Sequence, residues 1–435
     1  MFRNFKLKRL SVCVAAACTV LGTGAAQAGI GFRAGNWDLD ISGNVNGFAT
    51  WNKCDDKTFN IAGGLACNNG NPNGSGNSTV NSIESGLLPS ALVFSAKTRQ
   101  ANLDIGFTIG FYPTIRTNPG VGSGNTALGN ASINVRQNFL TFGDKSWGQV
   151  KVGRDIGLYA SDAILADMTL LGVGSGAAFL GGVTTLGRIG IGYIYTDWIP
   201  QITYSSPDWS GFKFAVGAFQ GLDLEPVLIG VDPDGTNLTN HTQPGFQGKV
   251  SYEWKAAVGG KVWASFMQQT VKSNNNQFAP GSPGTQSVNG FAWDVGGLVN
   301  IAGFQGVLYY YNAGGIGTTA IGFGAAAFAN GTLQKRDSDG GYVQVTYKLG
   351  PVKLGYSYGQ SNLKLASNET SLGNPLLVKK NTSNIIGAYY ALTESLNLVG
   401  EVVWTEATAQ GTNPGVGGGN KISDTAFILG AILFF

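Results

Sequence analysis

Apolar and polar residues alternate strictly along several segments of the chain. From Trp37 to Trp51 one parity is apolar or small, whereas the other is mainly polar. The same alternation returns at 101–111, 246–254 and 343–349. Because successive side chains of a β-strand point to opposite faces, each segment is predicted to be a strand with one apolar and one polar face.

Alternation alone does not separate a membrane barrel from a two-layer sandwich, whose strands are also two-faced. Three further features favour the barrel: strands near ten residues long, aromatic residues at strand ends, and connections that are short on one side and long on the other. Short connections are found at 144–148, 206–211, 255–257, 302–303, 350–351 and 393–395, and long Gly- and Asn-rich ones at 52–87, 113–132, 221–245, 270–288, 312–339, 361–382 and 406–420.

Hydrocarbon offers no hydrogen-bond partners, so a membrane-spanning sheet has to close on itself. The polar parity then faces a water-filled lumen and the apolar parity faces lipid. The pattern predicts an all-β transmembrane antiparallel barrel of about sixteen strands. These are expected near 37–51, 90–98, 101–111, 133–142, 149–155, 197–205, 212–220, 246–254, 257–267, 290–300, 303–311, 340–349, 351–360, 383–392, 396–405 and 421–435.

The last predicted strand ends on an aromatic residue. Phe427, Leu429, Leu433 and the terminal Phe435 share one parity. A chain that ends inside a strand is expected to close the sheet by pairing with the first strand, since ordinary domains more often end in a frayed tail. An alternating apolar ending in Phe resembles the endings of outer-membrane barrels.

Composition excludes other classes of protein. Only 12% of the residues are charged, about half the usual share of a soluble domain. Past the N-terminus no apolar run reaches 18 residues, which excludes a bundle of membrane helices. The 11% aromatic content argues against disorder.

The first 28 residues have the layout of a secretory signal peptide. Four cationic residues precede an apolar stretch from Leu10 to about Leu21, and the segment ends in Ala26-Gln27-Ala28. We therefore expect cleavage after Ala28, which leaves a single domain at 29–435. The remaining chain has 24 Lys and Arg against 25 Asp and Glu, so no basic patch for nucleic acid is expected.

Cleavage also leaves two cysteines, Cys54 and Cys67, in an exported protein. Oxidising surroundings favour a disulfide between them, which would close one polar loop. Two free thiols are the alternative, and a metal site lacks further Cys or a nearby His. No cofactor or metal is expected.

One connection departs from the pattern. The region 156–196 is long and partly apolar, with a helix-compatible piece at 160–170. A loop exposed to water should be polar, so this one is expected to pack against something, and the inside of the barrel is available.

Three short segments resemble the general, trimeric porins of Gram-negative bacteria. They are 149–168, which resembles strand 5 and the third loop of that family, 136–140, which resembles the preceding strand, and 204–212, which resembles a later turn. The resemblance implies an outer-membrane porin, a homotrimer in lipid, through which small hydrophilic solutes and ions diffuse passively. It also implies that the third loop folds inward and narrows the pore.

By this resemblance the pore constriction includes wall and loop charges: Arg136, Lys151, Arg154, Asp155, Asp162 and Asp167. Asp162 and Asp167 are the expected loop acids, and Arg136 shares an inward parity with Asn134 and Asn138. Arg154 shares parity with Val150 and Val152, so it points to lipid unless Gly153 bulges. The family's acid after the Asp-Met pair is missing, because Leu170–Gly174 follow, so the eyelet is expected to be less acidic and to favour anions.

Further lumen-facing residues are expected at Asp38, Asp40, Lys97, Asp104, Lys249 and Glu253. Alternatives to a general pore are a solute-selective, anion-preferring channel of the same architecture, a barrel enzyme and a structural or adhesive barrel. Serine–histidine chemistry would depend on His241, the only histidine, which has no partner that the sequence places. We therefore do not expect an enzyme.

Overall fold

The computed structural model describes residues 29–435 except 58, 68–77, 116–132, 178–183, 223–242, 273–285, 320–321 and 413–418. The predicted signal segment and His241 lie outside the described residues. Among the described residues, no helix is both long and apolar enough to cross a membrane.

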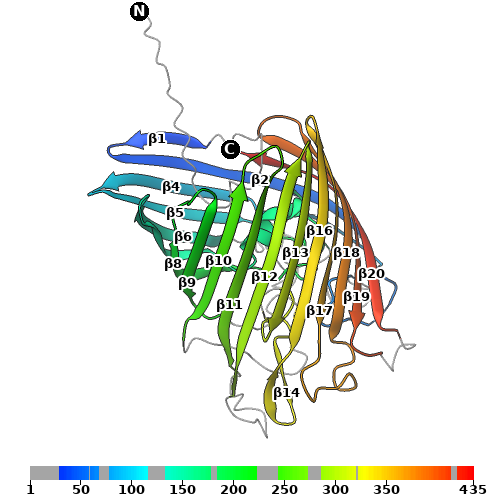
Figure 1. The fold of residues 1–435 in the computed structure, drawn as a ribbon. Helices are drawn as coiled ribbons and strands as arrows, with labels where there is room; N and C mark the ends of the chain where they lie inside the picture. The colour runs from blue at the N-terminus through cyan, green and yellow to red at the C-terminus, as the bar shows by residue number, and fades with distance from the viewer. Residues whose placement is uncertain are drawn as a thin grey trace, which may run out of the picture.

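Sixteen antiparallel strands form the wall of a barrel, as the alternation predicts (Figure 1). Their bounds lie within five residues of the predicted ones. They are β2 (Trp37–Lys53), β4 (Ala91–Gln100), β5 (Leu103–Pro113), β6 (Ile133–Asp144), β7 (Gly148–Ile156), β8 (Trp198–Ser205), β9 (Phe212–Phe219), β10 (Gly245–Trp254), β11 (Gly259–Lys272), β12 (Ser287–Ile301), β13 (Phe304–Gly314), β16 (Asp337–Leu349), β17 (Val352–Leu363), β18 (Val378–Ala391), β19 (Leu396–Ala409) and β20 (Lys421–Phe434).

The barrel closes where its first and last strands meet. β2 pairs with β4 on one side and with β20 on the other, from Asn44 opposite Phe434 to Lys53 opposite Thr425. The terminal Phe435 exchanges two backbone hydrogen bonds with Gly43. The expected closure of the last strand against the first is therefore confirmed.

Four short strands accompany the wall. β1 (Ile30–Ala34) forms a hairpin with the start of β2, and β3 (Thr79–Glu84) pairs with its end. β14 (Ala326–Ala329) and β15 (Thr332–Lys335) form a separate hairpin. The sequence reading did not predict these strands, although Gly35-Asn36 is a two-residue hairpin signal and Gly35 has a φ of 61°.

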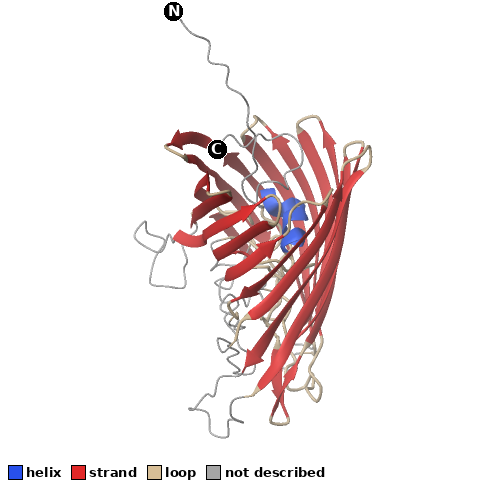
Figure 2. Ribbon diagram, turned by 60° about the vertical axis from the view of Figure 1, so that its left-hand side comes forward, coloured by secondary structure: helices blue, strands red, loops and turns tan. Residues whose placement is uncertain are grey.

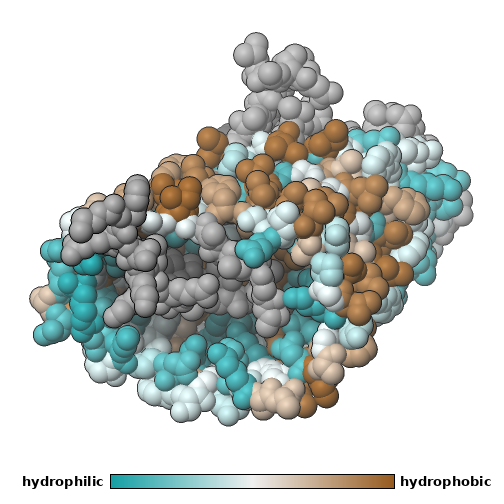
Figure 3. All heavy atoms as spheres, turned by 90° about the horizontal axis from the view of Figure 1, so that it is seen from above, coloured by the Kyte–Doolittle hydropathy of each residue, from teal (hydrophilic) through white to brown (hydrophobic). Residues whose placement is uncertain are grey.

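The two faces of the wall differ as the alternation requires. On β2, Val45 and Trp51 are exposed on the outside, whereas Asn44, Asn46 and Thr50 are buried on the inside. Seen from the end of the short turns, hydrophobic residues gather along the outer side and hydrophilic ones surround the hollow (Figure 3).

The inner face of β12–β19 is an exception, because it carries large apolar and aromatic residues. Tyr309, Tyr311, Tyr342, Tyr389 and Val403 are buried there. They pack against the long connection between β7 and β8, which contains α1 (Ser161–Ala166) and the 3-10 helix η1 (Met168–Leu171). Both helices lie within the ring of strands (Figure 2).

Candidate functional site

The connection between β7 and β8, residues 157–197, is the third long loop and runs across the lumen to the opposite wall. Its backbone N–H groups at Leu158 and Tyr159 donate to Gln247 of β10, at 2.8 and 3.0 Å. Ala160 donates to Asp294 of β12 at 3.0 Å. The expected inward fold of this loop is therefore confirmed in the described residues.

Asp162 fixes α1 to the wall through two lysines. Its carboxylate lies 3.0 Å from Nζ of Lys249 on β10 and forms a second ion pair with Lys261 on β11. Burial by itself raises the pKa of Asp162, but the two ammonium groups outweigh it, so this pKa lies below its ordinary value. The carboxylate therefore stays ionised and acts as an anchor.

Asp167 is also used within the structure. It accepts hydrogen bonds from Thr169 at 2.9 Å, from the Tyr193 hydroxyl at 2.9 Å and from the Arg188 backbone at 3.2 Å. The Arg188 guanidinium is buried and donates to Ser357 of β17 and Ser383 of β18. These bonds fix the returning half of the loop.

The expectation that Asp162 and Asp167 face the opening as eyelet acids is therefore corrected. Both carboxylates are buried between the loop and the wall. Asp162 has two wall lysines as partners, whereas Asp167 has hydroxyl and backbone partners within the loop itself, so neither buried carboxylate is left unpaired. The acids hold the loop and do not line its free edge.

Arg136 is turned inward by a bulge in β6. The register between β5 and β6 shifts at this point, so that Gly110 faces Gln137 while Phe111 faces Val135. Arg136 is the extra residue, and its guanidinium lies 5.5 Å from the centre of the inward Tyr112 ring. The bulge also reverses the later parity, so Asn138 faces outward, contrary to the expectation that it shares the side of Arg136.

Arg154 faces the other way. It lies opposite Asn138 of β6 and Pro200 of β8, and neither pairing of β7 contains a register shift. The bulge required at Gly153 is therefore missing, and Arg154 keeps the outward parity of Val150 and Val152 with an exposed side chain. Its expected place in the constriction is corrected to the outer face.

The next inward residues on β7 form a polar network with β5 and β6. Asp155 forms an ion pair with Lys151 and accepts a hydrogen bond from Gln137 at 3.1 Å. Gln137 in turn accepts from the Tyr112 hydroxyl at 2.6 Å. The network places Lys151 and Asp155 on the lumen side beside Arg136.

The six other expected lumen residues all lie on inward parities. Asp38 lies opposite Lys97, Lys97 opposite Gly106, and Asp104 opposite Arg99, with which it forms an ion pair of 2.7 Å. Asp40 lies opposite Ser95. Lys249 contacts α1, and Glu253 lies four residues further along β10 on the same face, opposite Lys261.

Three ion pairs beside the third loop have the same asymmetry of exposure. In each wall pair the ammonium is the more exposed partner: 23% against 6% for Lys151 and Asp155, 21% against 4% for Lys249 and Asp162, and 22% against 4% for Lys261 and Asp162. In these three pairs the lysine side chains are therefore more accessible to a solute than the carboxylates.

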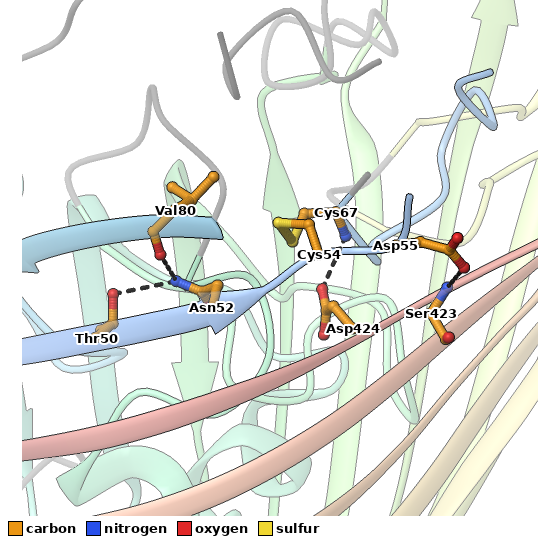
Figure 4. The surroundings of a disulfide bond; sticks show 8 residues. All are labelled: Thr50, Asn52, Cys54, Asp55, Cys67, Val80, Ser423 and Asp424. Atoms are coloured by element: carbon orange, nitrogen blue, oxygen red, sulfur yellow. Dashed lines mark hydrogen bonds between the residues drawn. A yellow bond between two sulfur atoms is a disulfide. The ribbon is translucent and has the colours of Figure 1, made fainter. Parts of the chain in front are cut away.

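A disulfide joins Cys54 and Cys67, as expected (Figure 4).

Three residues that hold the third loop were not predicted from the sequence: Lys261, Arg188 and Glu401. Glu401 of β19 accepts hydrogen bonds from the backbone N–H groups of Val173 and Gly174 at 2.9 and 2.8 Å. The available signal was a charged residue on an inward parity, which applies to Lys261 and Glu401.

Comparison with known proteins agrees with this architecture. A family model described as Gram-negative porin matches residues 14–410. Among curated proteins no sequence match was found.

Solved structures share the fold at low sequence identity. The outer membrane channel DcaP of Acinetobacter baumannii is 16% identical, with a TM-score of 0.65 over 93% of this chain and 99% of that one. OmpF of Salmonella typhi, in complex with daunomycin, is 14% identical, with a TM-score of 0.54 over 92% and 100%. OprB of Pseudomonas putida is 10% identical, with a TM-score of 0.55 over 91% and 94%. The family match covers most of the sequence and the barrel accounts for it, so this chain belongs to the Gram-negative porin family, whose members are channels of the outer membrane.

Proposed function

We propose that the protein is a diffusion pore with a preference for small hydrophilic anions. The support is the asymmetry of three ion pairs, in which Lys151, Lys249 and Lys261 are partly exposed while Asp155 and Asp162 are buried. Charges inside a narrow, low-dielectric wall focus the local potential, so exposed ammonium groups raise the local concentration of anions.

Passive diffusion needs no cofactor, and none is proposed. Polar groups on the part of the wall that the loops leave uncovered can form hydrogen bonds with a hydrophilic solute in place of water. An apolar solute forms no such bonds and is not stabilised there. We propose a homotrimer in outer-membrane lipid on the basis of the family, and a pore in preference to an enzyme or an adhesive barrel. A solute-selective channel is the second candidate, favoured if one class of solute blocks the current saturably.

The test is the reversal potential of single channels in a planar bilayer under a salt gradient. We expect the wild type to show a reversal potential whose sign indicates anion preference. The preference should be reduced in Lys151→Gln, because this change removes a partly exposed positive charge from the lumen. Lys421→Gln is the matched control, since Lys421 lies on an outward parity of β20 and pairs with Glu406. Cation preference in the wild type contradicts the proposal.

A further inference from the structure

The segment from Cys54 to Cys67, here called the disulfide lobe, follows β2 and lies against the inner wall at the long-loop end of the barrel. Asn381 of β18 and Asp424 of β20 share the inward parities of Ser383 and Ala426, and both contact it. From the sequence we expected only that a disulfide would close one polar loop here, and its position inside the barrel was not predicted.

Four polar contacts fix the lobe to this wall. The Cys67 N–H donates to Asp424 at 2.8 Å, and the Ser423 N–H donates to Asp55 at 3.0 Å (Figure 4). The Asn381 side chain accepts from the Leu65 N–H at 3.1 Å and donates to the Gly63 carbonyl at 2.9 Å. The lobe is therefore bonded to the wall at its start and along its last five residues.

Apolar contacts explain why the lobe lies inside. At the long-loop end, the inward residues Leu363, Ala407 and Ile422 would face water in an open lumen. Instead they form one buried cluster with Phe59, Ile61 and Ala66 of the lobe. Burial of this apolar surface stabilises the docked lobe, because the same side chains would otherwise be exposed to water.

The lobe also contacts the third loop. A Cβ placed on Gly190 of that loop would lie 2.9 Å from Cδ1 of Leu65 and 2.7 Å from Cγ2 of Thr319, which belongs to the connection between β13 and β16. From the same connection, the Phe323 ring packs against Gly63. Three connections therefore meet inside the barrel and occupy the lumen together.

We propose that the disulfide lobe is a second constriction, which together with the third loop sets the upper size of the solutes that pass. The third loop narrows the lumen beside β10–β19. The lobe narrows it beside β18–β20, at the long-loop end of the barrel. The disulfide restricts the lobe to conformations that keep it docked. This inference requires a conducting pore but does not depend on its ion preference.

The test compares single-channel conductance and the size limit for uncharged sugars in liposome swelling. We expect Cys54→Ser/Cys67→Ser to raise conductance by roughly two-fold and to admit larger sugars, because conductance grows with the open cross-section. Asp424→Ala should act in the same direction, since it removes the acceptor for the Cys67 N–H while leaving the disulfide intact. Reduction of the folded wild type with dithiothreitol gives the same comparison without a mutation.

Glu406→Ala is the matched control, because Glu406 lies opposite Ser423 at the same level but on the outward parity. It should leave both quantities unchanged. Unchanged conductance and size limit in folded Asp424→Ala and in the reduced wild type would overturn the proposal. A change in reversal potential alone bears on ion preference and counts against a size-setting role.

Discussion

At the scale of single residues, Arg136 reaches the lumen because β6 carries a bulge there. Arg136 and Gln137 are neighbours in sequence, yet both face inward beside Tyr112. Two adjacent inward residues bring a charge and an amide to one point of the wall. The family resemblance placed the wall arginine at Arg154 instead, and that residue lies on the outward parity.

Arg136→Glu should lower the anion preference. The change replaces a cation beside the Lys151–Asp155 pair with an anion, which reverses the local potential. The measurement is the reversal potential under a salt gradient, and Arg154→Glu is the comparison, because Arg154 lies on the outward parity. An equal shift in both variants, or none in Arg136→Glu, contradicts the assignment.

The alternation of residue types predicts which side each residue takes only while the register is unbroken. All six residues assigned to the lumen from strand parity, from Asp38 to Glu253, lie on inward faces. Arg136 and Arg154 differ from them because their side depends on where the bulge lies. A bulge leaves one residue unpaired in whichever strand carries it, so the sequence allowed one at Gly153 of β7. The structure has it at Arg136 of β6 instead.

At the scale of elements, the third loop is packed against the inner wall along much of its described length. Asp162 pairs with two wall lysines, and Glu401 accepts hydrogen bonds from two backbone N–H groups of the loop. The apolar inward residues of β12–β19, such as Tyr309 and Val403, are what the loop covers. Their presence on a parity that should face water was the sequence signal for such a covering.

The attachment of α1 should withstand mild acid. The pKa of Asp162 lies below its ordinary value of 3.8, so its stabilising effect is present above that value and is lost as the pH falls through the lower, folded pKa. We expect steady open-channel current from pH 7 to pH 5 and increased noise only in strong acid.

Asp162→Asn should show that noise already at pH 7, since it leaves Lys249 and Lys261 without their anion at a cost of roughly 3 kcal/mol. The measurement is open-channel noise in planar bilayers across this pH range. Matching noise in wild type and variant at pH 7 would refute the anchoring role.

The loops limit what could be predicted from the sequence. The wall strands follow from alternation because lipid and water impose one rule along each of them. The docking of residues 54–67 depends instead on contacts with β18 and β20, more than 300 residues away along the chain. No local pattern encodes such a distant partner.

At the scale of the whole molecule, one ring of sixteen strands separates an apolar outside from a polar inside, and inward loops narrow the space within. In our proposals, ion preference depends on the partly exposed lysines of the lumen and the size limit depends on the inward loops. Both proposals depend on the claim that successive residues of a wall strand face lipid and water alternately.

Adjacent cysteine substitutions on β10 test that claim most directly. Val250 lies on the outward parity and Ser251 on the inward one, and the two native cysteines of the described chain are joined to each other. In proteoliposomes, Ser251→Cys should react with a charged, water-soluble thiol reagent and lose conductance, whereas Val250→Cys should react only with a lipid-soluble maleimide. Equal reaction of both variants with the charged reagent would contradict the account.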